Sequence, residues 1–217
     1  MAMEESFDVL DANGALTGVS CPRSEVHACG FFHRAVHVWL LSAATGEVLL
    51  QRRAAHKDSW PDLWDVSSAG HVSAGGASLP SVQRELEEEL GLRAPAARLR
   101  FLFTHLERAA SVQHDKAFIN NEFQDLYVLS VTPEERGLLD PACATLRDLA
   151  APAAAAAEEG EPLGLLALQR SEVSAVTWVP LQELERMYRE KDPSIVPWDT
   201  GADLERLLQE LRSCVSA

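Results

Sequence analysis

The sequence lacks long apolar runs and any recognisable secretion signal. No apolar stretch approaches the ~18 residues that a membrane-spanning helix requires, so we expect no membrane span and no membrane partner. The N-terminus, MAMEESFDVLD, is acidic and has neither the basic nor the apolar region of a secretory signal. These absences predict a cytoplasmic location.

Cysteine is scarce and scattered. Cys21, Cys29, Cys143 and Cys214 include no CxxC pair, so the spacing typical of structural zinc sites is missing. Cys21 and Cys29 are eight residues apart, which makes only a weak case for metal ligation. Scattered thiols are typical of reduced cysteines in a cytosolic protein.

Positive charge is also in short supply. The chain has 19 Lys and Arg against 33 Asp and Glu, a formal net charge of −14. A polyanionic nucleic acid is therefore not an expected partner. A small anionic substrate remains compatible with this charge, because a bound divalent cation can reverse the local field.

The remaining composition is that of an ordinary folded domain. A length of 217 residues suits one domain, and the 47% of apolar residues can form a core. Strands alternate with a few helices, which predicts an α/β fold in the broad sense (α+β): a mixed sheet with helices on its faces. Strands are predicted at residues 35–41, 48–52, 64–72, 99–109, 122–131 and 173–180, and helices at 78–91, 181–190 and 201–215.

Local signals refine two of these segments. Ser78 is a plausible N-cap of the helix at 78–91, Pro80 lies in its first turn, and Gly91 is well placed to end it. The stretch from Pro141 to Pro162 is rich in Ala and Pro and lacks periodicity. We interpret it as a surface insert without a function of its own.

The helix at 78–91 carries an unusual cluster of acids. At about 100° per residue, Glu85, Glu88 and Glu89 fall in one sector, beside a stripe formed by Val82, Leu86 and Leu90. Like charges at this spacing repel one another and destabilise a helix. Two interpretations stay open: a solvated acidic face, or a site for a hard divalent cation that neutralises the repulsion.

The stretch GHVSAGGASLPSVQRELEEELGL resembles the Nudix signature, G-x(5)-E-x(7)-R-E-U-x-E-E-x-G-U, where U is a bulky apolar residue. One position departs, because Gly76 stands where the family usually has an acid. The resemblance covers about residues 32–188 and implies a single Nudix domain, a mixed sheet sandwiched between helices. The matching positions are Gly70, Arg84, Glu85, Leu86, Glu88, Glu89, Gly91 and Leu92.

The resemblance implies roles for these residues. Glu88 and Glu89 would be the main ligands of Mg²⁺, with Mn²⁺ as an alternative. Glu85 would be a further ligand or would orient the attacking water, and the carbonyl of Gly70 would add a backbone ligand. Arg84 would hold the glutamates by charge-assisted hydrogen bonds. The absence of an acid at residue 76 is expected to affect the rate and the rigidity of the loop more than it affects metal binding.

Three residues outside the signature are further candidates. Glu122, at the start of a predicted strand, is a candidate general base, although it is equally an ordinary polar residue at a strand edge. His33 is a candidate substrate contact or a structural histidine. Trp60 is a candidate for stacking against the substrate or a core residue.

The segments HRAVHVWLL, VLLQRRAAHKDSWPDLWD and SSAGH resemble the isopentenyl-diphosphate isomerase-like branch of the Nudix proteins. In that branch an Arg and a Lys four residues later grip the substrate diphosphate, and Arg53 and Lys57 have that spacing. A solvated basic turn is the alternative. The isomerases also need a catalytic cysteine, yet the matching stretch reads SSAGH and no cysteine lies between Cys29 and Cys143. We therefore favour hydrolysis over isomerisation.

Three hypotheses follow for the function. The first is a Mg²⁺-dependent pyrophosphohydrolase acting on a small, nucleoside-linked organic diphosphate, as a monomer or homodimer. The second is an isomerase-like or prenyl-diphosphate-hydrolysing enzyme. The third is a non-catalytic ligand-binding module that kept the fold. The signature does not choose the substrate, because specificity lies in loops outside it.

Overall fold

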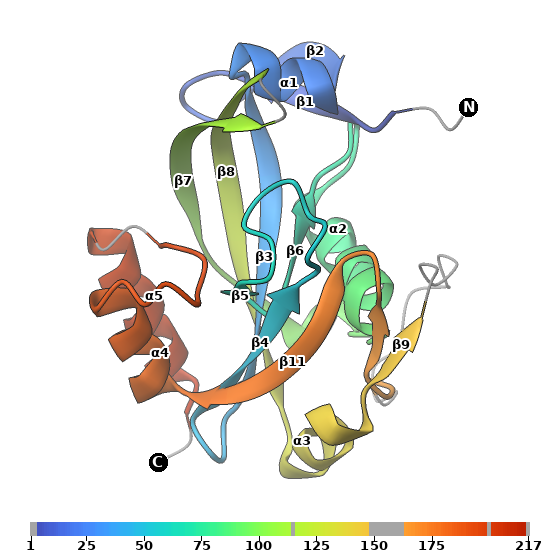
Figure 1. Ribbon diagram of the computed structural model, residues 1–217, viewed down its shortest axis with the longest axis vertical. Coiled ribbons are helices and arrows are strands. Elements are labelled where there is room, and N and C mark those ends of the chain that lie inside the picture. The colour runs from blue at the N-terminus through green and yellow to red at the C-terminus, as the bar shows by residue number, and fades with distance from the viewer. Residues whose placement is uncertain (1–3, 114–115, 148–162, 199–200, 216–217) are drawn as a thin grey trace.

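The computed structural model of the chain describes residues 4–113, 116–147, 163–198 and 201–215. A large mixed sheet forms its centre (Figure 1), with strand order β11-β4-β3-β1-β2, with β5 on β4, β6 and β8 on β3, and β7 on β8. The strands are β1 (Ser6–Leu10), β2 (Leu16–Pro22), β3 (Phe32–Ser42), β4 (Glu47–Arg53), β5 (Trp64–Asp65), β6 (Ser68–His71), β7 (Leu99–Gln113), β8 (Lys116–Val131), β9 (Thr145–Arg147), β10 (Ala167–Gln169) and β11 (Val173–Pro180). The helices are α1 (Arg23–Cys29), α2 (Ser78–Glu85), η1 (Leu86–Leu90), η2 (Ala96–Arg98), α3 (Pro133–Leu138), η3 (Pro141–Cys143), α4 (Leu181–Arg189) and α5 (Ala202–Ser213).

Strand β3 organises the sheet. It runs parallel to β8 over its whole length and antiparallel to β4 and β6, which makes the sheet mixed as predicted. Alternate residues of a strand face opposite sides. Val36 and Val38 accordingly join the apolar core beneath α2, whereas Trp39 and Leu41 join the core beneath α4 and α5.

Helices cover both faces of the sheet, which confirms the predicted fold class. Figure 1 shows α4 and α5 on one side and α2 on the other. The predicted helices at 181–190 and 201–215 are present with nearly the same bounds. Among the described residues, no helix is long and apolar enough to cross a membrane.

The helix that carries the glutamates differs from its prediction in two respects. Ser78 is not its N-cap: Ala77 holds that position, and the hydroxyl of Ser78 donates to the buried carboxylate of Asp125 instead. A buried acceptor here outcompetes the local capping signal. The helix also ends in a π-helical turn, η1, before Gly91 terminates it with a left-handed φ of 75°. The wider turn alters the angles expected for an ideal α-helix.

Residues 4–31, ahead of the predicted core, form two strands and a helix. Hairpin β1–β2 and helix α1 pack beside β3 and β8 at the top of Figure 1. The sequence did not predict β1 and β2, since β1 has only 5 residues and β2 is exposed along nearly its whole length and lacks an apolar face. Phe7 and Val26 are nonetheless fully buried in a small core of their own.

Part of the predicted insert lies among the described residues. Residues 141–147 form η3 and β9, and β9 pairs in parallel with β10. The remainder of the insert, residues 148–162, lies outside the described residues.

We expect deletion of residues 151–160 to leave folding and activity nearly unchanged, because this segment has no apolar periodicity and no candidate catalytic group. Differential scanning calorimetry and turnover measurements check this. The matched control is Leu163→Ala just downstream, which removes a side chain that is only 1% exposed from the core. We expect this substitution to lower the free energy of unfolding by about 2–5 kcal/mol. A fall in Tm of ~10 °C or more on deletion would show that the segment packs on the core.

Candidate active site

Helix α2 and turn η1 place the signature glutamates at the edge of the core. Val82, Leu86 and Leu90 are fully buried, as predicted, and hold the helix on the sheet. Glu85 and Glu89 are themselves buried, with exposed fractions of 8% and 6%. The solvated acidic face is thereby excluded for these two carboxylates.

Gly70 makes room for Glu85. It lies on β6 opposite Val36, and a Cβ atom added there would stand 2.1 Å from the carboxyl carbon of Glu85. No side chain fits at that distance, so the carboxylate lies directly against the backbone of Gly70. This close approach explains why glycine begins the signature in this chain.

Arg84 bridges two of the glutamates. Its Nη2 lies 2.7 Å from Oε1 of Glu85, and its Nη1 lies 2.9 Å from Oε2 of Glu88. Nη2 also donates to the carbonyl oxygen of His71 at 2.9 Å, which ties the helix to β6. The predicted positioning role of Arg84 is consistent with these contacts.

Glu89 is held by donors from strand β6. Its Oε2 accepts from the hydroxyl of Ser68 at 2.7 Å and from the backbone N–H of Ala69 at 3.1 Å. Burial nevertheless raises the pKa of Glu89 to about 7. Burial and then the repulsion from Glu89 raise the pKa of Glu85 well above its usual range. A hard divalent cation binds clustered carboxylate oxygens, and its charge favours the ionised form of buried acids. Glu85 and Glu89 therefore suit such an ion.

The loop that contains Gly76 is tied to the N-terminal strand. The N–H of Ala74 donates to the carbonyl of Ser6, and the N–H of Gly75 donates to Oδ2 of Asp8, both at 2.8 Å. A Cβ at Gly76 would stand 2.8 Å from the carbonyl oxygen of Ser73, so the usual acid would not fit this turn without a backbone shift. Contacts from β1 hold the loop where the acid is missing.

Asp8→Ala is therefore expected to loosen this loop and lower kcat by about fivefold, the equivalent of one lost hydrogen bond of ~1 kcal/mol. Steady-state kinetics with a metal titration check this. Asp11→Ala is the matched control, because Asp11 accepts from the N–H groups of Asn13 and Ala15 in the same hairpin without contacting the loop. Equal kcat values for Asp8→Ala and the wild type would contradict the account of the loop.

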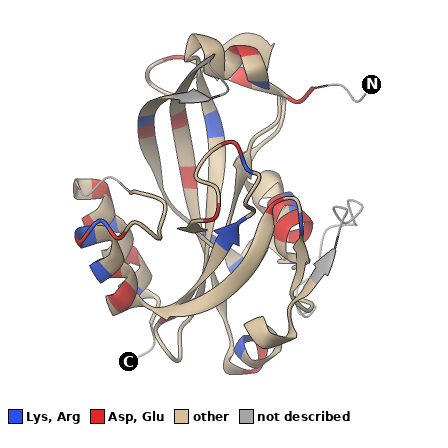
Figure 2. Ribbon diagram, in the orientation of Figure 1, with Lys and Arg blue, Asp and Glu red and all other residues tan. Residues whose placement is uncertain are grey.

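Two cations face this site from the end of β4. Figure 2 shows basic residues at the end of β4 and acidic residues on the helix beside it. Nη1 of Arg53 lies 3.0 Å from Oδ2 of Asp65, and its Nε donates to the carbonyl of Ser59 at 3.0 Å. Lys57 forms an ion pair with Glu172. Both cations are thus positioned by acids.

A single cavity joins these groups. It has a volume of about 1360 Å³ and is lined by residues of both the glutamate helix and the end of β4. Trp60, 45% exposed and with a positive φ of 49°, lies on its wall as expected for a residue that could stack on a ligand. The cavity is lined by Glu85, Glu88, Glu89, Arg53, Lys57 and Trp60, among others.

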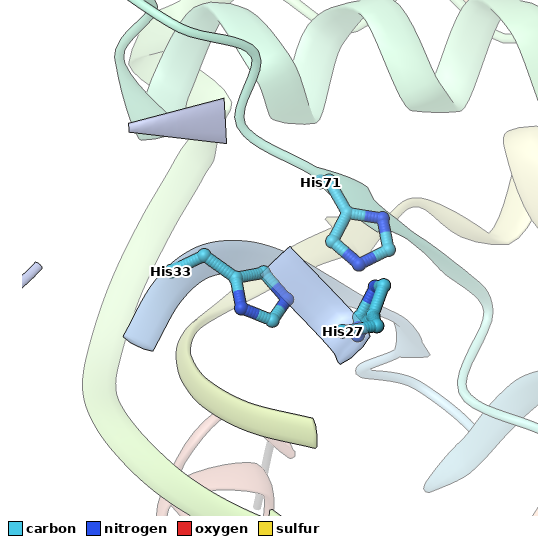
Figure 3. Close-up of side chains that lie close together, drawn as sticks. All are labelled: His27, His33 and His71. Carbon is cyan, nitrogen blue, oxygen red and sulfur yellow. The ribbon is translucent and has the colours of Figure 1, made fainter. Parts of the chain in front are cut away.

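Three histidines cluster beside the glutamates. His27 from α1, His33 from β3 and His71 from β6 point toward one another (Figure 3), with one nitrogen of each within 4.8 Å of the others. Both ring nitrogens of His27 lack a hydrogen-bond partner among the described residues. Burial lowers the pKa of His27 to about 3. Three imidazoles at this spacing could hold a borderline metal such as Zn²⁺.

His71 is already engaged on both sides. Nη1 of Arg23 lies 2.9 Å from its Nδ1, and because arginine only donates, Nδ1 is the acceptor and the proton lies on Nε2. Nε2 in turn lies 3.2 Å from Oε1 of Glu122. A metal bound at Nε2 would have to replace this proton.

Glu122 belongs to this cluster. Its Oε1 lies near His71 and 3.4 Å from Nε2 of His33, and its Oε2 accepts from the amide of Gln124 at 2.8 Å. Although burial opposes ionisation, the two imidazoles hold the pKa of Glu122 well below its usual range. A carboxylate held ionised in this way is a weak proton acceptor.

The structure corrects the expectation for His33. Its side chain is fully buried and stacks on the ring of Phe7, with centroids 5.5 Å apart. It does not line the cavity. A structural position, the alternative considered for a lone histidine, describes it better than a substrate contact.

Sequence reasoning missed several charged cavity residues, among them Arg23, Glu107 and Glu172. Glu107 faces Glu122 across β7 and β8, and burial raises its pKa to about 7. Each of the three comes from a segment far from the signature, and no local motif marks it. Only the fold brings them together.

Comparison with known proteins agrees with this geometry. The sequence model of the NUDIX domain matches residues 31–199. The chain belongs to the NUDIX family. Enzymes of this family generally use a divalent metal, which suits the buried glutamates of this chain.

Individual relatives extend this result. Nudix hydrolase 3 of Arabidopsis thaliana is 43% identical over 209 residues; the match covers 96% of this chain but only 23% of that protein. An isopentenyl-diphosphate Delta-isomerase of Serratia proteamaculans is 34% identical over 126 residues, covering 58% of this chain and 66% of that protein. The crystal structure of DR0079 from Deinococcus radiodurans shares the fold, with a TM-score of 0.56 at 16% identity, covering 98% of this chain and 100% of that one.

Proposed function

We propose that this protein is a Mg²⁺-dependent hydrolase that cleaves the diphosphate linkage of a small organic diphosphate by attack of water on phosphorus. One observation carries the proposal: buried Glu85 and Glu89 lie in the same cavity as Arg53 and Lys57. Carboxylates on one side can hold a cation, and cations on the other can hold phosphate oxygens. A diphosphate between them would meet favourable charge on both sides.

The residues of the chain have separate tasks in this proposal. Glu85, Glu88 and Glu89, with the backbone of Gly70, would hold Mg²⁺, and Arg84 keeps Glu85 and Glu88 in place. The bound ion would lower the pKa of water and neutralise developing charge on phosphate. Arg53 and Lys57 would orient the diphosphate.

The organic part of the substrate would lie along the remaining cavity wall. Trp60 is the exposed aromatic side chain nearest in sequence to the two cations, and it offers a surface on which a flat group can stack. We therefore place a nucleoside-linked diphosphate ahead of a prenyl diphosphate.

No specific observation favours isomerisation. The hydroxyls of Ser67 and Ser68 stand in the stretch where the isomerases have their cysteine. Ser67 donates to the carbonyl of Leu49 at 2.5 Å, and Ser68 donates to Glu89 at 2.7 Å. Both are buried and engaged, and a hydroxyl is far less acidic than a thiol.

The test is a phosphate-release screen with and without Mg²⁺. It covers nucleotide sugars, dinucleoside polyphosphates, oxidised nucleotides, thiamine diphosphate and prenyl diphosphates, with isopentenyl diphosphate also assayed for isomerisation. We expect Mg²⁺-dependent cleavage of at least one nucleoside-linked compound and no isomerisation. Tight binding of a compound without turnover would instead support the non-catalytic module and overturn the proposal.

A further inference from the structure

One carboxylate of the cavity belongs neither to the proposed metal ligands nor to the residues proposed to hold the diphosphate. Glu172 lies in the turn directly before β11, and it lines the cavity together with Gln51, Lys57 and Glu89. Its backbone is fixed: its carbonyl accepts from the N–H of Ala54 at 2.9 Å, and its N–H donates to the carbonyl of Gln169 at 2.8 Å. The side chain is therefore presented from a rigid turn.

Glu172 lies close enough to Glu89 to influence it. Burial is the main cause of the raised pKa of Glu89, and the negative charge of Glu172 adds to it, whereas the positive charge of Lys57 opposes it. The register of β4 and β11 explains this proximity, since Val173 pairs with Arg53 and Val176 pairs with Gln51, whose amide donates to Glu89 at 3.3 Å. Glu172 thus stands at the edge of the glutamate cluster.

Of the other cavity acids outside the signature, three near the proposed site have partners elsewhere: Glu122, Glu107 and Asp65. Both oxygens of Glu122 are occupied by the histidines and Gln124. One oxygen of Glu107 accepts from the amides of Asn120 and Gln124, and this residue lies on β7, beyond β8 and β3 from the signature helix. Asp65 holds Arg53.

Glu172, by contrast, has a partner that a diphosphate would compete for. Lys57 is one of the two cations expected to grip the substrate, and its side chain is 28% exposed while that of Glu172 is 30% exposed. Ion pairs that remain partly exposed to solvent are weak, worth about 0.2–1 kcal/mol. An incoming diphosphate carries more charge than one carboxylate and can draw Lys57 away.

We propose that Glu172 is the proton acceptor of the reaction and that Lys57 holds it until a diphosphate arrives; this rests on the proposed hydrolase function. Lys57 moves its hydrogen bonds from Glu172 to a phosphate oxygen, which leaves the carboxylate unpaired beside the metal site. Water then attacks one phosphorus, and one of its protons passes to Glu172. The bond from that phosphorus to the bridging oxygen breaks, and its electron pair leaves with the second phosphate group. Glu172 finally returns the proton to solvent or to the departing phosphate.

Two kinetic results are expected. Glu172→Gln should lower kcat by about a hundredfold or more, within the range of general base catalysis, while KM stays equal or falls. Sodium formate should restore part of the activity of Glu172→Ala, because formate can enter the vacated space and accept the proton. Glu183→Gln is the control, since Glu183 pairs with Arg186 on the exposed face of α4 and should retain wild-type kinetics.

A binding measurement separates this role from a structural one. Methylenediphosphonate, which has no bridging oxygen to break, serves as the probe at a fixed Mg²⁺ concentration in isothermal titration calorimetry. Glu172→Gln should bind it about fivefold more tightly, because Lys57 no longer has to leave a carboxylate. In a Lys57→Met background the same substitution should give little or no tightening.

Each outcome bears on one conclusion. If the wild type cleaves no diphosphate in the screen, the hydrolase function fails. If the wild type is active and Glu172→Gln keeps kcat within threefold, only the role of Glu172 is overturned. A loss confined to KM, or absence of rescue by formate, would also overturn it.

Discussion

Glu89→Gln is expected to cut turnover by about a hundredfold or more, because it removes a charge from the ion site that stabilises the transition state. The amide has nearly the same shape as the carboxylate and can still accept from Ser68 and Ala69. The fold should therefore survive. Since Glu89 is buried beside Glu85, loss of one like charge should raise the Tm of the metal-free protein.

Isothermal titration with Mn²⁺ measures the ion site directly. Wild type should bind Mn²⁺, and Glu88→Gln/Glu89→Gln should bind it far more weakly. Glu87→Gln is the matched control, because Glu87 lies in the same turn but pairs with Arg93 at 3.1 Å and does not line the cavity. Equal Mn²⁺ affinity in wild type and the double variant would contradict the assignment of Glu88 and Glu89 as metal ligands.

Arg53→Ala should lower kcat/KM by roughly ten- to a hundredfold, since one charged contact to phosphate contributes about 1.5–3 kcal/mol. The Mn²⁺ affinity of the free enzyme should not change, because Arg53 contacts Asp65 and Ser59 and none of the signature glutamates. Arg53→Lys should restore only part of the activity, because lysine cannot make a two-pronged contact.

Arg52→Ala is the matched control for Arg53. Arg52 is the neighbouring residue, its guanidinium pairs with Asp62 at 3.0 Å and lies over the ring of Trp64, and it does not line the cavity. If Arg53 merely covers apolar surface with its stem, Arg53→Ala would lower Tm and leave kcat/KM within about twofold of wild type. That result would contradict the proposed contact between Arg53 and the substrate diphosphate.

The fold and the signature helix were predictable because their signals are local. Strand alternation, the Val82, Leu86 and Leu90 stripe and the terminating Gly91 all lie within short windows of sequence. The sequence also predicted that Glu85, Glu88 and Glu89 lie together. It could not show that two of them are buried, since burial depends on what the helix packs against.

The residues that were missed or misplaced depend on contacts between distant segments. Ser78 has a typical N-cap position in the sequence, but its hydroxyl donates a hydrogen bond to Asp125 of strand β8 instead. His27 becomes part of a cluster only because the fold brings α1 close to His33 of β3 and His71 of β6. Glu172 reaches Lys57 across 115 residues of sequence. No periodicity or spacing rule connects such pairs.

The N-terminal strand gives a further example. The departure at Gly76 indicated a loop with a missing support, and the structure supplies that support from Ser6 and Asp8, outside the region matched by the NUDIX domain. A motif describes its own residues only. The segment that compensates for a changed position has to be found in three dimensions.

The central claim is that water attacks phosphorus at the Mg²⁺ site of the signature glutamates. It is tested most directly by running the reaction in ¹⁸O-labelled water with the compound cleaved fastest in the screen, and locating the label by mass spectrometry. The account predicts one ¹⁸O atom per turnover, bound to phosphorus in one phosphate-containing product, with turnover that requires Mg²⁺ and is lost in Glu89→Gln. Label on carbon of the organic product, or full turnover by Glu89→Gln, would contradict it.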